Sequence, residues 1–257
     1  MGTPLSARAL PGIPELAPGD DLAALIVDAA RAAGMAEMLS GGAVLAIAHT
    51  AVSKVEGAIV ALEDVVPSPR ARELAQEHGK DARLIEVVLS ETAELLRAER
   101  GVLICRTRHG LVCANAGVDT SNASGDGTVV LLPRDPDDSA RSVRARLREL
   151  LGDEAPAVLI TDTFGRPWRN GQVDVAIGLA GMHALDDWRG RADERGLELR
   201  ATWIAIADAA AAATDLVRAK DSGEPVVVIE GLERFVCAED GPGAAALIRP
   251  LEEDLFR

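Results

Sequence analysis

Three polar stretches hold the side chains of this sequence that could do chemistry. They are SKVEG (53–57), NAGVDTSN (115–122) and TDTFGRPWRNGQ (161–172). Each follows an apolar run, and together they supply Lys54, Asp119 and Asp162. Carboxylate oxygens are ligands of hard divalent cations, and a lysine neutralises phosphate as a point charge. The combination predicts phosphate chemistry assisted by a metal ion.

Each of these residues also has an ordinary structural explanation. Lys54 alone reads as a solvated lysine at a strand end. Asp119 can close an Asx-turn, and Asp162 can cap the turn that follows it. Trp168, one of few aromatic residues in the chain, has an even claim to a packing role. The stretches favour a site only together, because random loops seldom repeat this polarity.

The segments that must position these stretches alternate between strand and helix patterns. Apolar runs predict strands at 43–52, 128–133, 155–161 and 225–231, and two strands around a His109-Gly110 turn within 101–117. Helical patterns cover 20–34, 68–99, 138–152 and 202–218. Asp138 and Ser139 are the expected cap of the third helix. The order predicts an α/β or mixed α+β fold with the polar stretches at one sheet edge.

Composition excludes several classes of protein. A net charge of −14 argues against a nucleic-acid partner, which requires clustered Lys and Arg. The three cysteines share no CxxC spacing, so neither a disulfide framework nor a zinc cluster is indicated. No signal peptide and no apolar run of roughly 20 residues is present, so a cytoplasmic protein without a membrane partner is expected.

The usual nucleotide and hydrolase motifs are missing. No Walker A sequence occurs, and GLAGMHA (178–184) lacks the strand-turn-helix context of a dinucleotide site, so neither a P-loop nor a Rossmann fold is expected. No GxSxG is present, and the histidines show no metal-ligand spacing. Any nucleotide site must therefore be of another kind.

The sequence resembles the coenzyme F-420-0:L-glutamate ligase (F-420 gamma-glutamyl ligase) family from about Leu10 onward. The resemblance rests on blocks in the same order: IPELAPGDDL (13–22), VSKVEG (52–57), AGVDTSN (116–122), LLPRDPDDSA (131–140), TDTFGRPWRNGQVDVAIG (161–178), and IADAAAAATDLV (206–217) with PVVVIEG (225–231). It implies a two-lobed α/β fold, a single domain over 1–257 without a sharp boundary between the lobes, and a homodimer.

The same resemblance implies the ligands and their residues. The expected ligands are GTP, L-glutamate, the deazaflavin precursor F-420-0, two divalent ions (Mg or Mn) and K. By position, the expected nucleotide contacts are Ile13, Pro14, Glu15, Leu16, His49, Lys54 and Asn122. Asp119 and Asp162 are expected to hold one metal ion, and Thr163 a second.

The implied reaction joins an acid to an amino acid. A carboxylate of the precursor attacks the γ-phosphate of GTP, and the glutamate amine then displaces phosphate from the acyl phosphate. Lys54 and Asp162 would act on the transferring phosphoryl group. We further expect Arg166 and Arg169 to clamp a substrate phosphate or carboxylate, since a planar guanidinium binds either through two hydrogen bonds.

The sequence departs from its relatives in places. His49 stands where many relatives have a small hydroxyl residue, and the loop 218–221 lacks a Met-Gly pattern that some relatives carry. Actinobacterial relatives often continue past a DLF segment into a nitroreductase-like domain, and this sequence ends at DLFR (254–257), so we expect the ligase part alone. Two alternatives stay open: a different acceptor acid or amine, or a nucleotide-binding homologue without ligase activity.

Overall fold

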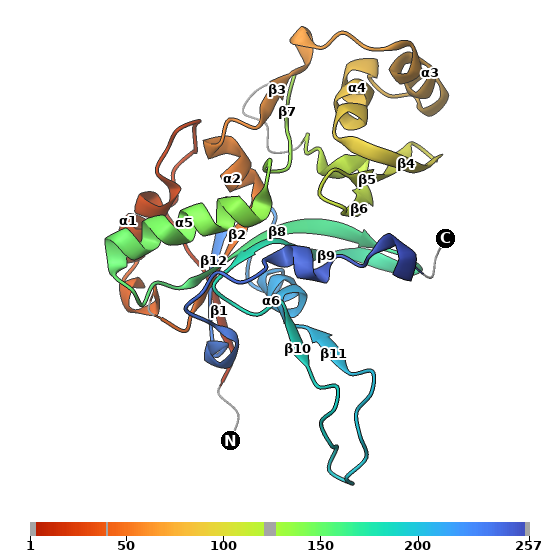
Figure 1. Cartoon of the computed structure of the whole chain (residues 1–257). Coiled ribbons are helices and arrows are strands. Elements are labelled where there is room, and N and C mark those ends of the chain that lie inside the picture. The colour runs from red at the N-terminus through yellow and green to blue at the C-terminus, as the bar shows by residue number, and fades with distance from the viewer. Residues whose placement is uncertain (1–3, 40, 121–126, 255–257) are drawn as a thin grey trace.

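A computed structural model describes residues 4–39, 41–120 and 127–254 and has a mixed α/β architecture with several sheets (Figure 1). The largest sheet has five strands in the order β1-β12-β2-β8-β9. The strands are β1 (Ser6–Ala9), β2 (Val44–Ala48), β8 (Ala157–Arg166), β9 (Arg169–Ala180) and β12 (Val226–Glu230). Strands β2 and β8 are parallel, and the other neighbours pair antiparallel. The predicted mixed α/β class is confirmed.

Helices cover both faces of this sheet. Helices α1 (Leu22–Ala32) and α5 (Pro136–Leu151) pack on one face, and α6 (Ile206–Thr214) packs on the other. Along β2, Leu45 and Ile47 belong to the first cluster, whereas Val44 and Ala46 belong to the second. Burial on both faces is why β2 reads as a continuous apolar run instead of an alternating one.

A second group of elements lies above strands β8 and β9 in Figure 1, away from helix α2 (His49–Val55). It has its own apolar cluster and comprises α3 (Pro69–His78), α4 (Ala82–Ser90), β4 (Thr92–Glu99), β5 (Val102–Thr107) and β6 (Val112–Ala114). The short pair β3 (Ile59–Ala61) and β7 (Thr128–Val130) connects this group to α2 and α5. Strands β10 (Leu185–Asp187) and β11 (Trp203–Ala205) begin a hairpin that projects from the sheet in Figure 1.

Several expected boundaries were wrong. The strand expected over 43–52 ends at Ala48, where α2 begins, so Lys54 lies in the last turn of a helix and not at a strand end. The segment 68–99 is not helical throughout, because Thr92–Glu99 pairs with β5. Helix α5 is capped by Asp135, whose carboxylate accepts from the Asp138 amide at 3.0 Å. The expected helix over 202–218 is shortened to α6 by strand β11 before it and a loop after it.

The stretch TDTFGRPWRNG (161–171) forms the outer part of the hairpin made by β8 and β9, including its turn. Strand β8 continues through Arg166, and β9 begins at Arg169. Trp168 lies at the tip with a φ of 58° and is 82% exposed, so of its two possible roles the structure does not support packing in the core. Across the described part of the chain, no helix combines the length and apolar character needed to cross a membrane.

Candidate functional site

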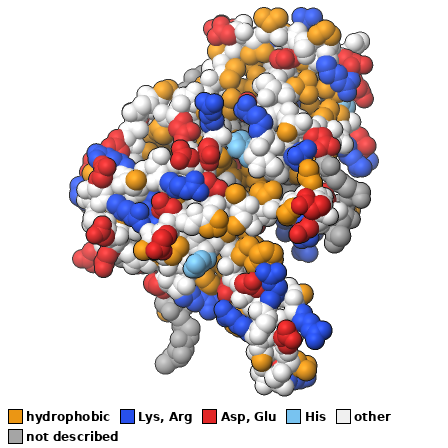
Figure 2. Space-filling view, in the orientation of Figure 1, with side chains coloured by type: hydrophobic (Ala, Val, Ile, Leu, Met, Phe, Trp, Pro, Cys, Tyr) orange, Lys and Arg blue, Asp and Glu red, His pale blue; other side chains and the backbone are white. Residues whose placement is uncertain are grey.

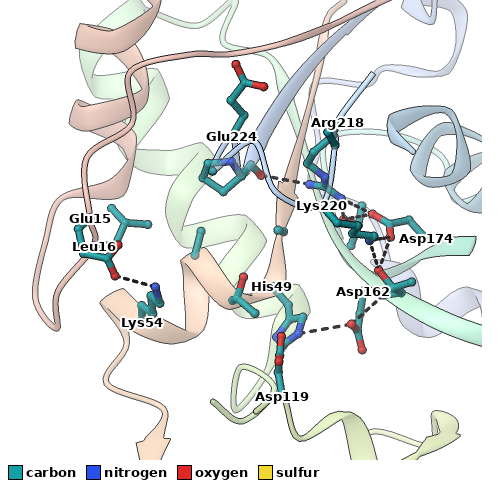
Figure 3. Close-up of a pocket in the computed structure, with 18 of the residues that line it drawn as sticks. Glu15, Leu16, His49, Lys54, Asp119, Asp162, Asp174, Arg218, Lys220 and Glu224 are labelled. Atoms are coloured by element: carbon teal, nitrogen blue, oxygen red, sulfur yellow. Dashed lines mark hydrogen bonds and ion pairs between the residues drawn. The ribbon is translucent and has the colours of Figure 1, made fainter. Parts of the chain in front are cut away.

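A cavity of about 250 Å³ lies at the carboxyl ends of the parallel strands β2 and β8 (Figure 3). Strand β2 ends at Ala48, opposite Thr161, so beyond this point β8 has lost its parallel neighbour. Carboxyl ends of parallel strands are where α/β sheets hold ligands. The remaining walls come from the segment before α1, from α2, and from the loop between α6 and β12.

Asp162 is a buried carboxylate with little positive charge around it. Its side chain is 14% exposed, and its Oδ1 lies 3.4 Å from Nε2 of the buried His49 and accepts from the Thr163 amide at 2.7 Å. Burial raises the pKa of Asp162. His49 and the Thr163 amide oppose this effect, while the carboxylates of Asp174 and Asp119 add to it. The corner around Asp162 therefore lacks a strong cation of its own.

The backbone holds Asp119 in place beside Asp162. The amide and carbonyl of Asp119 pair with Val130 of β7 at 2.9 and 2.8 Å, and its side chain lines the cavity. Strand β6 packs against β8. Burial raises the pKa of the Cys113 thiol on β6 to about 12, and the nearby Asp162 carboxylate contributes to that rise. Two carboxylates thus meet against a poorly hydrated wall.

Asp174 on β9 is more deeply buried than Asp162 but is surrounded by donors and cations. Its side chain is 0% exposed, and its Oδ2 accepts from the hydroxyls of Thr161 and Thr214 at 3.0 and 3.2 Å and from the Arg218 guanidinium. Its Oδ1 accepts from the Thr163 hydroxyl at 2.6 Å.

The charge balance around Asp174 is opposite to that around Asp162. Lys220 Nζ lies 3.5 Å from Asp174 Oδ1 and donates to the Thr163 hydroxyl at 2.6 Å. Burial alone would raise the pKa of Asp174, but the Thr163 hydroxyl, Arg218 and Lys220 outweigh it and hold that pKa below its ordinary value. The negative charge of Asp174 is therefore already compensated by Arg218 and Lys220.

Lys54 lies across the cavity from Asp119 and Asp162. Its Nζ donates to Glu15 Oε1 at 2.8 Å, and its side chain is 15% exposed against 74% for Glu15 (Figure 3). The stem of Lys54 is therefore covered by protein, whereas the Glu15 side chain is largely exposed. An incoming phosphate can replace the Glu15 carboxylate as the partner of Lys54, because its oxygens accept the same charge-assisted hydrogen bond.

Most of the residues predicted for the site lie around this one cavity. Those that line it are Pro14, Glu15, Leu16, His49, Lys54, Asp119, Asp162 and Thr163. Ile13 is partly buried against the main apolar cluster, and Asn122 lies outside the described residues. Arg166 and Arg169 lie near the hairpin tip, where the Arg166 guanidinium donates to the Asn170 carbonyl at 2.6 Å. Neither arginine lines the cavity, and their role as a substrate clamp stays a prediction.

The residues of this cavity that were not predicted from the sequence include Asp174, Arg218 and Lys220, which form its charged cluster. A local signal existed only for Asp174, a single acid in the otherwise apolar run VDVAIG (173–178). An acid in a buried strand requires hydrogen-bonding partners, which marks it for attention. The loop 218–221 was singled out as a departure from relatives, but its contacts with β9 could not be read from that pattern.

The residues present fit one divalent ion better than two. Asp119 and Asp162 offer oxygen ligands in a corner that lacks positive charge, which suits Mg²⁺ or Mn²⁺. The described residues contain no ready cluster of three or more His, Cys, Asp or Glu for a metal ion, so phosphate oxygens and water would complete the coordination. At the position expected for a second ion, the Thr163 hydroxyl donates to Asp174 and accepts from Lys220. A second divalent ion does not fit there while Lys220 is in place.

Comparisons with known proteins agree on one family. Residues 12–231 match the family F420-0:Gamma-glutamyl ligase. The coenzyme F420:L-glutamate ligase of Methanopyrus kandleri is 48% identical over 242 residues, covering 93% of this chain and 92% of that protein. The protein of the same name from Methanothermobacter thermautotrophicus is 44% identical, covering 98% and 99%, and that of Methanocaldococcus jannaschii is 41% identical, covering 85% and 86%. The chain therefore belongs to the F420-0:gamma-glutamyl ligase family.

Proposed function

We propose that this chain is a GTP- and metal-dependent ligase that adds L-glutamate to coenzyme F420-0 through an amide bond in coenzyme F420 biosynthesis. The observation that carries the proposal is the cavity at the ends of β2 and β8, which is lined by Lys54 on one side and by Asp119 and Asp162 on the other, with the Lys54 ammonium bound to Glu15. Family membership and the names of the relatives support the same reaction. The cavity of about 250 Å³ is below the usual size of a whole ligand pocket and suits the phosphate end of a nucleotide.

The first half of the reaction transfers a phosphoryl group. A carboxylate oxygen of the acceptor attacks the γ-phosphorus of GTP, the bond to the β-phosphate oxygen breaks, and GDP leaves with that electron pair. Lys54 would exchange Glu15 for a phosphate oxygen and neutralise charge that spreads over the transferring group. A divalent ion, Mg²⁺ or Mn²⁺, held by Asp119 and Asp162 would supply further neutralising charge when bound. His49 would hold the Asp162 carboxylate in position from the opposite side.

The second half forms the amide. The glutamate amine attacks the carbonyl carbon of the acyl phosphate, phosphate leaves with the electron pair of the broken C–O bond, and the amine releases a proton. Lys220 supplies positive charge on the side of the cavity opposite Lys54, near the leaving phosphate. Its ammonium takes the position at Thr163 where a second divalent ion was expected, and we propose that this chain uses one such ion.

We also propose that the two groups of elements are the lobes of the two-lobed fold of this family and that the chain acts as a homodimer. The separate apolar cluster of α3, α4 and β5 supports the first proposal. Light scattering on the purified protein tests the second, with twice the 26.9 kDa chain mass as the expected result. The requirement for K⁺ is tested by replacing it with Na⁺ in the assay.

Mass spectrometry of the products tests the function. The purified protein is incubated with coenzyme F420-0, GTP, MnCl₂ and isotopically labelled L-glutamate. We expect the acceptor to gain the mass of one labelled glutamyl residue. One GDP should form for each amide bond, and without GTP neither the heavier product nor GDP should appear. An unchanged acceptor in the full mixture would contradict the proposal. Other small carboxylates and amines in the same assay define the acceptor range.

Thermal denaturation with GTP and Mn²⁺ separates the remaining alternative. A homologue that binds nucleotide without catalysis would be stabilised by GTP and metal yet form no GDP with both substrates present. The proposed ligase is stabilised and also forms GDP.

A further inference from the structure

A second cavity, of about 620 Å³, lies where the β5–β6 hairpin meets the start of α5 and the segment 242–248. Arg108 and His109 reach it from the turn of the hairpin, and Arg134 and Arg141 reach it from the start of α5. Figure 2 shows basic side chains and a histidine gathered between these elements on the face turned to the reader. In a protein of net charge −14, such a gathering of arginines calls for an anionic occupant.

Two of these arginines are free to bind an anion. Among the described residues, the guanidinium groups of Arg134 and Arg141 make no hydrogen bond and no ion pair. His109 donates to or accepts from the chain only through Nε2, which lies 3.1 Å from the Arg134 carbonyl oxygen. Its Nδ1 is buried and has no partner in the described chain. Arg108 is held by Glu91 at 2.6 Å and adds charge at the rim.

The acidic residues of this cavity are already used by the backbone. Asp137 accepts from the amides of Leu179 and Ala244 at 2.8 and 2.7 Å, and Asp135 caps α5. Neither carboxylate forms an ion pair with an arginine of this cavity among the described residues, so Arg134 and Arg141 can still bind a planar oxyanion such as carboxylate, or phosphate.

The floor of the cavity is apolar. Leu111, Ile177 and Ile248 line it and pack in or against the main apolar cluster. An apolar floor beneath unpaired guanidinium groups suits a ligand with an apolar body and an anionic group. This chemistry favours a large acceptor over glutamate, which has no apolar body.

The start of α5 is held firmly against the sheet. A Cβ at Gly178 would lie 2.2 Å from the Pro136 carbonyl oxygen, so only glycine lets α5 approach β9 this closely. The block LLPRDPDDSA (131–140), which contributed nothing to the first cavity, forms this wall of the second. Arg134 and Arg141 are therefore presented from a rigid support.

The two cavities lie close together along the β8–β9 hairpin. Asp162 pairs with Val175, and Ile177 lies two residues further along β9, about 7 Å at the rise of a strand. Ile160 and Phe164 pack in or against the same apolar cluster as Ile177, so Asp162 between them leaves β8 on the same face. A ligand held in the second cavity can extend a carboxylate toward the Asp162 corner.

We propose that this second cavity binds the acceptor of the ligase, with Arg134 and Arg141 holding an anionic group of the acceptor other than its reacting carboxylate. The inference rests on the proposed function for the identity of the ligand. Glutamate offers the same oxyanion chemistry, and the experiment below distinguishes the two sources.

Steady-state kinetics on Arg134→Met and Arg141→Met test the proposal. Methionine keeps much of the side-chain volume and removes the charge. We expect the KM for coenzyme F420-0 to rise at least tenfold in each variant, with the KM for GTP and for glutamate within about twofold of the wild type. Arg146→Met is the matched control, because Arg146 lies on α5 like Arg141 but lines neither cavity. It pairs instead with Asp21 and Glu149.

Calorimetric titration of coenzyme F420-0 into the protein, without GTP or metal, gives a readout that does not depend on turnover. Binding at least tenfold weaker in Arg141→Met than in Arg146→Met, at equal melting temperatures, supports the acceptor site. If the arginine variants raised only the KM for glutamate, the cavity would be an oxyanion site that binds glutamate and not the acceptor. Unchanged affinity and unchanged KM values for both ligands would overturn the proposal. A wild-type protein that binds F420-0 without adding glutamate would refute the proposed function and leave this site standing.

Discussion

Two buried aspartates on one hairpin have opposite electrostatic surroundings. Asp162 on β8 and Asp174 on β9 both line the first cavity, and neither side chain is more than 14% exposed. Asp174 has a guanidinium, an ammonium and three hydroxyls around it, whereas Asp162 has one imidazole and one backbone amide. Burial penalises both charges, but only Asp174 is compensated.

The difference assigns Asp174 a role in stabilising the fold and Asp162 a role in binding a ligand. A buried carboxylate with fixed partners stabilises the fold that brings them together. A buried carboxylate without such partners carries an unfavourable negative charge that a bound cation would stabilise. Groups with pKa values shifted in this way are common at functional sites. The predictions below test this comparison.

Asp174→Asn should cause the largest change, a loss of about 3–5 kcal/mol in the free energy of unfolding, because it leaves Arg218 buried without its counter-charge. Urea denaturation measures it. The control is Asp28→Asn, since Asp28 pairs only with the exposed Arg31. If Asp174→Asn and the control were equally stable, Asp174 would not be the structural member of the pair.

Asp162→Asn should reduce kcat by about 10²–10³-fold, the range seen when one electrostatic stabiliser of a transition state is removed. The fold should survive, since asparagine keeps the shape and removes an uncompensated charge. Glutamate addition is measured by mass spectrometry at saturating substrates. Turnover near the wild-type rate would remove Asp162 from the reaction.

The pH dependence of stability should have opposite signs for the two aspartates. The lowered pKa of Asp174 means that its stabilisation is present above the unfolded value of 3.8 and is lost as pH falls through the folded pKa. The raised pKa of Asp162 means that the folded state binds the extra proton, so stability is lost as pH rises from 3.8 through the folded pKa.

In EDTA at neutral pH, Asp162→Asn should therefore be more stable than the wild type. The gain should shrink as the pH is lowered through the folded pKa of Asp162 and vanish below 3.8, where Asp162 is protonated in both states. Denaturation series at several pH values measure this difference. A variant less stable than the wild type in EDTA would show that Asp162 is compensated after all.

Lys220→Met should have the smallest effect on stability, at most about 1 kcal/mol, because the Lys220 side chain is 67% exposed. It should instead change the metal content. With the ammonium gone from Thr163, Asp174 and Thr163 become available to a second ion, and Mn²⁺ titration followed by electron paramagnetic resonance should show a second bound ion with GTP. Lys80→Met, outside the cavity, is the matched control. An unchanged stoichiometry would show that Lys220 does not occupy an ion position.

The sequence allowed prediction of elements whose residues are buried on both faces. Strands β2, β8 and β12 were expected because their apolar runs are continuous, and the turn at Gly110 was expected from local chemistry, as its φ of 86° bears out. Helix α2 was missed because its N-cap, Ala48, offers no capping side chain and only His49 and Thr50 separate the apolar run of β2 from Ala51 and Val52. Periodicity cannot locate a boundary that composition does not mark.

The polar stretches predicted where the cavity lies, but not how its charges are arranged. Lys54, Asp119 and Asp162 come from stretches that are each polar over several residues, so a local pattern reveals them. Asp174 and Arg218 are 44 positions apart, and their contact depends on how α6 returns the chain to β9. Long-range pairing of this kind has no signature in a single sequence.

Mn²⁺ binding to the wild type and to Asp162→Asn tests the central claim most directly. Electron paramagnetic resonance, with a non-hydrolysable GTP analogue present, gives the number of bound ions and their affinity, and Asp28→Asn serves as the control. We predict one tightly bound Mn²⁺ in the wild type and in the control, and binding weaker by at least tenfold in Asp162→Asn. Equal Mn²⁺ affinity in all three proteins would contradict the assignment of the uncompensated corner as the metal site.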